Sequence, residues 1–297
     1  MSLRFLDEPG LNKVWNAIKD INPWMPKTAA AHNSIYRRKD VSYLISSDST
    51  VRLYDSLTDA SNLFNDVFVG DYFRFPKFQL TSEVIDQTIV YSCTVDSRTE
   101  VKYTIVGLDL EFNRGQSQIS SPITRHTITL MPDAPIGTLP MNDVFSTTTS
   151  GYVGTTIYSA LLDSYSSAIS SYLLNLNCGM SLSSSKHYLT SASSGGEATA
   201  GDWYRGDIRI PSVIEILGVH LGPHFEVGSD STQFPAFAFD PQLLMPEAES
   251  RTGFWLRTIR SDTQFYRINE YGQLGSRSAN ESNGVRPVIT IGPAVTE

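Results

Sequence analysis

The chain has 297 residues, of which 40% are hydrophobic, so it can bury a sizeable core as one large or two small domains. Its formal net charge of −8 argues against nucleic-acid binding, which needs a basic face. The N-terminus lacks the apolar segment of a secretory signal, and no apolar run approaches the length of a membrane span. We therefore expect a protein made in a cytoplasm, without membrane insertion.

The two cysteines, Cys93 and Cys178, are far apart in the chain. A single pair at this spacing does not indicate a disulfide framework. We expect two free thiols, each acting as a small core residue.

Residues 5–21 have the periodicity of an amphipathic helix. Five apolar side chains fall on one stripe, Leu11, Val14, Trp15, Ile18 and Ile21. Asp7 is a candidate N-cap, and Asn22-Pro23 ends the pattern. A helix this short is marginal alone, so its stripe should be buried against the protein's own body or against a neighbouring chain.

This segment reads FLDEPGLNKVWNAIK over residues 5–19. It resembles the FLDxxGLxxxWxxIK start of many phage tail and baseplate proteins, in which it is an attachment element. The resemblance implies that the apolar stripe is an assembly interface. It also divides the chain into an N-terminal attachment segment, residues 1–63, and a main domain, residues 64–297.

The rest of the N-terminal segment predicts short elements. Residues 23–40 are typical of a connector, in which Arg37, Arg38 and Lys39 form a solvated loop. Two short strands are predicted over 41–46 and 50–54, and a short helix over 58–65.

From residue 64 the pattern is rich in β-structure. Strands are predicted over 67–75 (interrupted at Gly70-Asp71), 89–95, 101–106 and 127–131. An apolar stripe predicts a helix over 159–176, although its many serines disfavour one. Residues 181–202, rich in Ser, Gly and Thr, predict a long surface loop, with a strand pair within 180–190 as the alternative. A short helix over 212–217 should end at Gly218.

Motifs for metal binding or catalysis are weak. His220 and His224 are separated by Gly-Pro, which breaks the helical face that such a pair needs. No EF-hand loop, nucleophile elbow, P-loop or dinucleotide fingerprint is present. The carboxylate pairs 247/249 and 109/111 have the residue types of a glycosidase but are more typical of solvated surface. We expect no cofactor, no metal and no catalytic residue.

The C-terminal stretch, residues 253–292, has two apolar strands that flank a polar insert. Arg257 and Arg286 lie beside the apolar residues of these strands. A buried guanidinium is costly unless carboxylates or carbonyls hold it, so both arginines are interpreted as structural. The insert alternates aromatic and charged side chains, the pattern of a recognition surface on a rigid frame.

Several motifs occur here in the order of a family of mostly uncharacterised phage and prophage domains. They are VGDY (69–72), LPMND (139–143), residues 151–173, IRIPSVIE (208–215), QFPAF (233–237), GFWLR (253–257), Phe265, Gly272 and GVRP (284–287). The closing segment is similar to that of C-type-lectin-like folds, which formylglycine-generating enzymes and phage receptor-binding proteins also use. The resemblance covers residues 64–292. It implies an α+β fold with mixed or antiparallel sheets and few short helices.

The resemblance also implies that the insert forms a ligand face. Its candidate residues are Arg260, Asp262, Gln264, Tyr266, Asn269, Tyr271, Arg277 and Asn280, with Gln273 and Asn283 between them. Tyr, Arg and Asn are typical of binding surfaces. The alternative is a polar hairpin that covers the core or faces a neighbouring subunit.

Together these features favour a bacteriophage virion structural protein, a tail, baseplate, fibre or capsid-decorating component, located in the virion. Its partners would be other virion proteins and copies of itself, for example in a trimer, with no nucleic acid. The alternative is an adhesion protein that binds a host protein or glycan. A formylglycine-type enzyme ranks last, because that family needs paired cysteines in its C-terminal part and Cys93 and Cys178 lie upstream.

Overall fold

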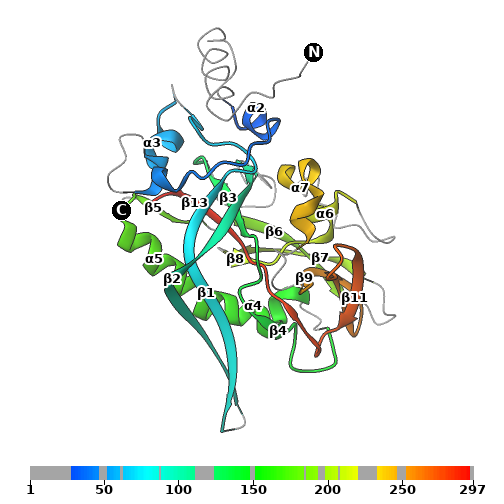
Figure 1. The fold of residues 1–297 in the computed structure, drawn as a ribbon. Coiled ribbons are helices and arrows are strands. Elements are labelled where there is room, and N and C mark those ends of the chain that lie inside the picture. Colours follow the sequence, from blue (N-terminus) through cyan, green and yellow to red (C-terminus); the bar gives the residue numbers. More distant parts are fainter. Residues whose placement is uncertain are drawn as a thin grey trace, which may run out of the picture.

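The computed structural model describes residues 28–46, 52–60, 63–86, 88–110, 124–147, 151–183, 185–192, 198–206, 208–219, 233–245 and 252–294 (Figure 1). The predicted helix over 5–21 lies outside these residues, and so do its stripe of Leu11, Val14, Trp15, Ile18 and Ile21 and the pair His220 and His224. Within the described part the architecture is α+β, built mostly from antiparallel strands with short helices.

The larger sheet has the strand order β1-β2-β3-β13-β5, and β8 also pairs with β13. Its strands are β1 Tyr72–Ile85, β2 Thr88–Leu108, β3 Ile128–Pro132, β5 Met180–Leu182, β8 Ile208–Arg209 and β13 Val288–Pro293. All pairings in it are antiparallel. The strands predicted over 89–95 and 101–106 are confirmed, but both belong to the single long strand β2. The strand predicted over 127–131 is confirmed as β3.

The register of β1 against β2 shifts between Pro76 and Lys77. Phe73 and Phe75 before the shift and Leu80 after it are all buried. Pro76 pairs with Glu100 and Lys77 with Asp96, so the extra residues, 97–99, lie on β2, and the inward-facing positions of β1 change from odd to even numbers at the shift. β1 and β2 then continue past the body of the protein as a two-stranded arm that ends at residues 86–88 (Figure 1).

The smaller sheet has the order β11-β10-β9-β12-β4. Its strands are β4 Thr138–Pro140, β9 Phe254–Ser261, β10 Gln264–Ile268, β11 Leu274–Ser278 and β12 Ser282–Gly284. The pairing of β12 with β9 is parallel and the others are antiparallel. The polar insert predicted near the C-terminus is therefore the meander from β9 to β11.

Most of the described residues within 181–202 are in strands in place of the predicted loop. β6 Ser185–Ala192 and β7 Ala198–Gly206 pair as an antiparallel hairpin, and residue 180 begins β5, which pairs with β13. Serine and threonine are compatible with paired strands, because the backbone supplies the ladder of hydrogen bonds. Composition alone therefore did not distinguish this hairpin from a loop.

The helical elements are short. They are α2 Ala29–Asn33, η1 Ser42–Ile45, α3 Leu53–Thr58, η2 Gly151–Gly154, α4 Thr156–Ala160, η3 Leu161–Tyr165, α5 Ser166–Leu176, α6 Val213–Leu217, α7 Pro235–Phe239 and η4 Pro241–Leu244. α4, the π-helical turn η3 and α5 follow one another without a break, which confirms the helix predicted over 159–176. α6 is also confirmed, with Ser212 in a capping box and Gly218 ending it at φ 70°.

The predictions for residues 41–65 are wrong for the parts of this stretch that the structure describes. Residues 42–45 form the 3₁₀ helix η1 in place of a strand, and Ser42 donates from its backbone N–H and its hydroxyl to Asp40. Residues 53–58 form α3, which ends where a helix was predicted to begin. Leu53 and Leu57 are both buried, four residues apart. This spacing puts two side chains on one face of a helix, but also on one face of a strand, so it did not identify the helix.

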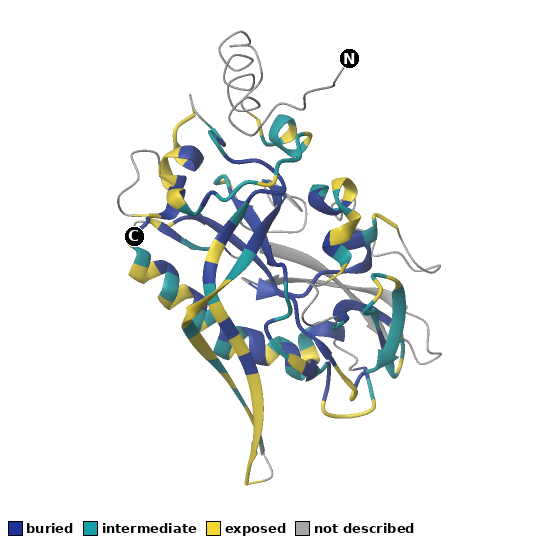
Figure 2. Ribbon diagram, in the orientation of Figure 1, coloured by how far each residue is buried: buried dark blue, intermediate teal, exposed yellow. Residues whose placement is uncertain are grey.

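The core consists of two clusters of buried side chains (Figure 2). The main core joins β1, β2 and β3 to α4–α5 and includes Tyr103, Tyr165 and Trp255. Leu44, Ile45, Leu53 and Leu57 belong to the same cluster, so the described part of residues 28–63 packs into the main core. The second core lies around Phe234, Phe237, Phe254 and Leu256. The boundary placed at residue 64 stays a prediction.

Candidate functional site

The proposed ligand face is mounted on a buried frame. Residues 254–259 of β9 are all buried, and Trp255 Nε1 donates to the carbonyl of Leu139 at 2.8 Å. On β10, Phe265 and Ile268 are buried in the main and second cores respectively. Because these anchors fix both strands, the polar side chains between them have defined positions.

Most of the candidate residues have partners within the protein. Arg260 Nη1 donates to Ser276 Oγ at 2.9 Å, and this hydroxyl lies 3.4 Å from Gln264 Oε1. Arg277 Nε donates to Glu281 at 3.0 Å, and its Nη1 donates to the carbonyl of Ser282 at 2.7 Å. These contacts tie β9, β10, β11 and β12 to one another across the sheet surface.

Asn269 closes the turn between β10 and β11. Its Oδ1 accepts the backbone N–H groups of Tyr271 and Gln273, each at 2.9 Å, and its Nδ2 donates to Gln273 Oε1 at 3.2 Å. Asparagine commonly holds a turn in this way. Tyr266 is half-buried against the second core, so it also has a packing role.

The remaining candidates are Asp262, Tyr271 and Asn280. They lie in three successive turns of the meander, after β9, β10 and β11, and all are exposed. Tyr271 is 65% exposed. Their side chains form no hydrogen bond with any described residue, so they are available to a partner. Asn283, in contrast, is buried.

Arg257 and Arg209 share one buried carboxylate. Arg209 Nη2 lies 2.8 Å from Glu215 Oε1, and Arg257 Nη1 lies 3.3 Å from Glu215 Oε2. Burial alone would raise the pKa of Glu215, but the charges of Arg209 and Arg257 outweigh it and hold the pKa at about 2. The structural interpretation of Arg257 is thereby confirmed. The sequence analysis did not identify Glu215 as the partner; this residue appeared there only as the last position of the IRIPSVIE motif.

Arg286 is held by carbonyls. It is 1% exposed, its Nε donates to Pro132 O at 2.9 Å, and its Nη1 donates to Leu243 O at 2.8 Å. Its guanidinium carbon lies 4.7 Å from the centroid of the Phe254 ring. The structural interpretation of this arginine is also confirmed. Burial lowers its pKa to about 10, against the opposing charge of Asp133.

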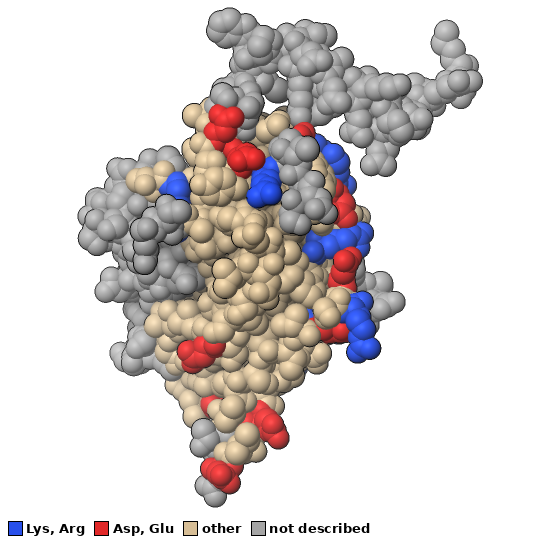
Figure 3. Space-filling view, turned by 90° about the vertical axis from the view of Figure 1, so that its left-hand side faces the viewer, with Lys and Arg blue, Asp and Glu red and all other residues tan. Residues whose placement is uncertain are grey.

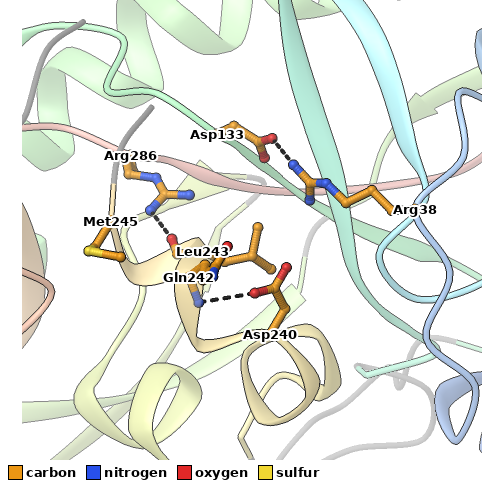
Figure 4. A pocket seen from close by; sticks show the side chains of 7 residues that line it. All are labelled: Arg38, Asp133, Asp240, Gln242, Leu243, Met245 and Arg286. Carbon is orange, nitrogen blue, oxygen red and sulfur yellow. Dashed lines mark hydrogen bonds and ion pairs between the residues drawn. The ribbon is translucent and has the colours of Figure 1, made fainter. Parts of the chain in front are cut away.

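A pocket with a volume of about 280 Å³ lies beside Arg286 (Figure 4). Its lining comes from four separate segments: Arg38, Asp133, the η4 region with Asp240, Gln242, Leu243 and Met245, and Arg286. The sequence analysis did not identify this pocket. The one feature of the sequence that could have indicated the pocket was Arg286, an arginine flanked by core residues.

Both carboxylates of the pocket have partners. Arg38 Nη2 donates to Asp133 Oδ2 at 2.6 Å. Tyr36 donates its hydroxyl to Asp240 Oδ2, also at 2.6 Å, and burial together with this contact raises the pKa of Tyr36 to about 12. The prediction of a solvated loop at 37–39 is therefore wrong. Arg37 is paired with Asp71 and Arg38 with Asp133, and both arginines are partly buried.

The two cysteines are free, as predicted, with Cys178 buried and Cys93 half-buried. Among the residues that the structure describes, no group of three or more His, Cys, Asp or Glu side chains could hold a metal ion. No helix in the same part of the chain is long and apolar enough to cross a membrane. Comparisons with family models, curated proteins and solved structures gave no match to this chain.

Proposed function

We propose that this chain is a structural protein of a bacteriophage virion, a tail, baseplate, fibre or capsid-decorating component that assembles with copies of itself. It attaches through its N-terminal segment and displays a C-type-lectin-like domain. The resemblance of residues 5–19 and of the motifs between 69 and 287 supports the virion and the lectin-like fold. The observation that carries the assembly role is the β1–β2 arm.

The arm ends in exposed β-branched side chains. Val84 is 69% exposed, Ile85 48% and Val90 43% (Figure 2). Val84 and Ile85 are neighbours on β1, so they lie on opposite faces of the two-stranded ribbon, and all three residues are near its tip. An isolated hairpin is marginally stable in water, and an apolar tip on a projecting arm is typical of a surface that a partner covers.

The side of the protein that carries α5 has few charges (Figure 3). The chain contains no Asp, Glu, Lys or Arg from Ser164 to Ser185, and Leu174 on α5 is 78% exposed. Protein interfaces are depleted in charge at their centre. We assign this side as the surface that receives the arm of a second copy. Such a head-to-tail contact closes into a ring when the rotation between copies allows it.

The mass of the purified chain in solution tests this proposal. We expect an oligomer by light scattering, and at least a tenfold weaker association for Val84→Lys, because a charge replaces apolar surface at the contact. Thr81→Lys is the matched control, since Thr81 is polar and exposed on the same arm. A monomeric wild type, or equal weakening by both substitutions, would contradict the assembly role of the arm.

The attachment element has its own test. Removing residues 1–25 should abolish incorporation into particles or binding to the neighbouring virion protein, while the fold remains as judged by circular dichroism. If the truncated chain is incorporated as well as the full chain, the attachment role of Leu11, Val14, Trp15 and Ile18 is wrong.

The second candidate function is adhesion to a host glycan or protein. The exposed, unbonded Asp262, Tyr271 and Asn280 favour it. Glycan-array binding that Tyr271→Ala removes would support this function, and retained binding would contradict the assignment. Tyr266→Ala is a poorer test, because Tyr266 packs on the second core. The third candidate function is that of a formylglycine-type enzyme. Turnover of a thiol substrate would be the evidence for it.

A further inference from the structure

The pocket beside Arg286 has an incomplete set of contacts. Nε and Nη1 of Arg286 are bonded to carbonyls, whereas Nη2 has no hydrogen-bond partner among the described residues. Figure 4 shows this nitrogen pointing towards the centre of the pocket. A guanidinium has five N–H donors, and those of a buried one need acceptors. The free donors therefore face the cavity.

The charge of Arg286 is also uncompensated by direct contact. Asp133, the carboxylate on the same wall, bonds to Arg38 and to the hydroxyl of Thr104. Arg286 itself forms no ion pair with any described residue. Two carbonyls provide partial charges only, and a buried cation without a counter-ion is unfavourable. An anionic group at Nη2 would both fill the hydrogen-bonding positions and neutralise the charge.

The opposite wall has a different character. Asp240 receives only neutral donors, the hydroxyl of Tyr36 and the backbone N–H of Gln242 at 3.0 Å. Its oxygens keep further lone pairs, which accept donors from a ligand. Leu243 supplies apolar surface between the two ends, and Met245, beside Arg286, is 49% exposed at the rim (Figure 4). The pocket thus has a cationic end, an anionic end and an apolar side.

We propose that this pocket binds a small carboxylate that also carries hydrogen-bond donors. The carboxylate accepts from Arg286 Nη2, and the ligand's hydroxyl or ammonium groups donate to Asp240. The volume of about 280 Å³ corresponds to roughly nine water molecules at liquid density, which suits a ligand of the size of a monosaccharide or an amino acid. A sugar acid and an amino acid share this chemistry. The inference does not depend on the proposed virion function.

The test uses the full-length chain and four probes: D-glucuronate with both groups, D-glucose with hydroxyls only, acetate with a carboxylate only, and glycine as the zwitterion. Binding is followed by NMR of the side-chain Nε–H of Arg286, which is buried and bonded to Pro132. We expect a saturable shift with glucuronate or glycine, and at least tenfold weaker binding of acetate and glucose. Two results would overturn the proposal. One is glucose binding as tightly as glucuronate, and the other is the absence of a saturable shift with both glucuronate and glycine.

Two variants locate the site. Arg286→Lys replaces three separate nitrogens with one, which cannot match the positions of both carbonyls and the ligand, so affinity should fall at least tenfold. Should this variant not fold, Met245→Trp narrows the pocket mouth and leaves Arg286 in place, with the same expected loss. Val144→Trp is the control, at an exposed position that does not line the pocket. Unchanged affinity in Met245→Trp would show binding elsewhere and overturn the assignment.

Asp240→Asn distinguishes the two ligand classes, a sugar acid and an amino acid. An amide still accepts hydroxyl donors but no longer attracts an ammonium group. If glycine is the probe that binds the wild type, Asp240→Asn should weaken it at least tenfold, which identifies an amino acid as the ligand class. If glucuronate is the probe that binds, its affinity should stay within about threefold of the wild type, which identifies a sugar acid.

Discussion

Glu215 accepts a hydrogen bond from Arg209 Nη2 at 2.8 Å, and the two side chains are 5% and 1% exposed. Arg257 approaches the second oxygen of the same carboxylate. One buried carboxylate therefore contacts two buried guanidinium groups, and it joins β8, α6 and β9, the first strand of the proposed ligand face.

Replacing Glu215 with glutamine should destabilise the fold strongly. The substitution keeps the size of the side chain but removes the buried carboxylate charge that Arg209 and Arg257 both contact, which costs about 3–5 kcal/mol. Denaturant unfolding of Glu215→Gln measures the loss. Glu281→Gln is the control, because Glu281 pairs with Arg277 at the surface and is mostly exposed, and it should cost less than about 1 kcal/mol. Equal losses in the two variants would contradict the buried triad.

Glu215 also predicts a pH dependence of stability. Its pKa in the folded protein is about 2, below the ordinary value of 4.5. A depressed pKa means that the carboxylate contributes stability above pH 4.5, which is lost as the pH falls towards 2. The free energy of unfolding of the wild type should therefore approach that of Glu215→Gln across this window, by at most about 1.4 kcal/mol per pH unit. Parallel curves for the two proteins would disprove the assignment.

Gly70 is required by its backbone conformation. Its φ is +88°, and a Cβ there would collide with the carbonyl of Arg37 and the ring of Tyr36. We expect Gly70→Ala to lower the free energy of unfolding by about 2–3 kcal/mol.

Gly275→Ala provides the comparison for Gly70→Ala. Gly275 lies on β11, and no heavy atom lies within 4 Å of the position its Cβ would take. Its free energy of unfolding should change by less than about 0.5 kcal/mol. Thermal unfolding of both variants measures the difference, and two similar melting temperatures would show that the segment 36–39 can move away from β1 at little cost.

The features that the sequence predicted correctly are set by local spacing. The stripe over 159–176 and the short helix over 212–217 that ends at Gly218 involve residues a few positions apart, so helix geometry reveals them directly. Arg257 and Arg286 were also interpreted correctly, because the cost of burying a guanidinium does not depend on which acceptor satisfies it. The acceptors themselves could not be predicted.

Features made by distant residues were missed. Arg38 donates a hydrogen bond to Asp133, which is 95 residues away in the chain, and Arg286 donates to the carbonyl of Leu243, which is 43 residues away. Such pairings follow from the sheet topology, which a single sequence does not determine. The pocket beside Arg286 is lined from four segments and was missed for the same reason. Within the predicted ligand face, Asn269 was assigned to binding although its spacing to Gly272 is also that of a turn.

Cys93 should react slowly despite being only half-buried. Burial raises the pKa of its thiol from 9.0 to about 11. The thiolate is the nucleophile, so at pH 8 its reaction with a disulfide reagent should be about 100-fold slower than that of an unshifted thiol, rising about tenfold per pH unit. The measurement uses a Cys178→Ala background, which leaves one thiol. The control is Ser82→Cys on the exposed part of the arm with both native cysteines removed, which should react at the ordinary rate. Equal rates for Cys93 and the control thiol at pH 8 would mean that β1 and β2 open readily at this point, and the arm would then be less rigid than its continuous strand pairing implies.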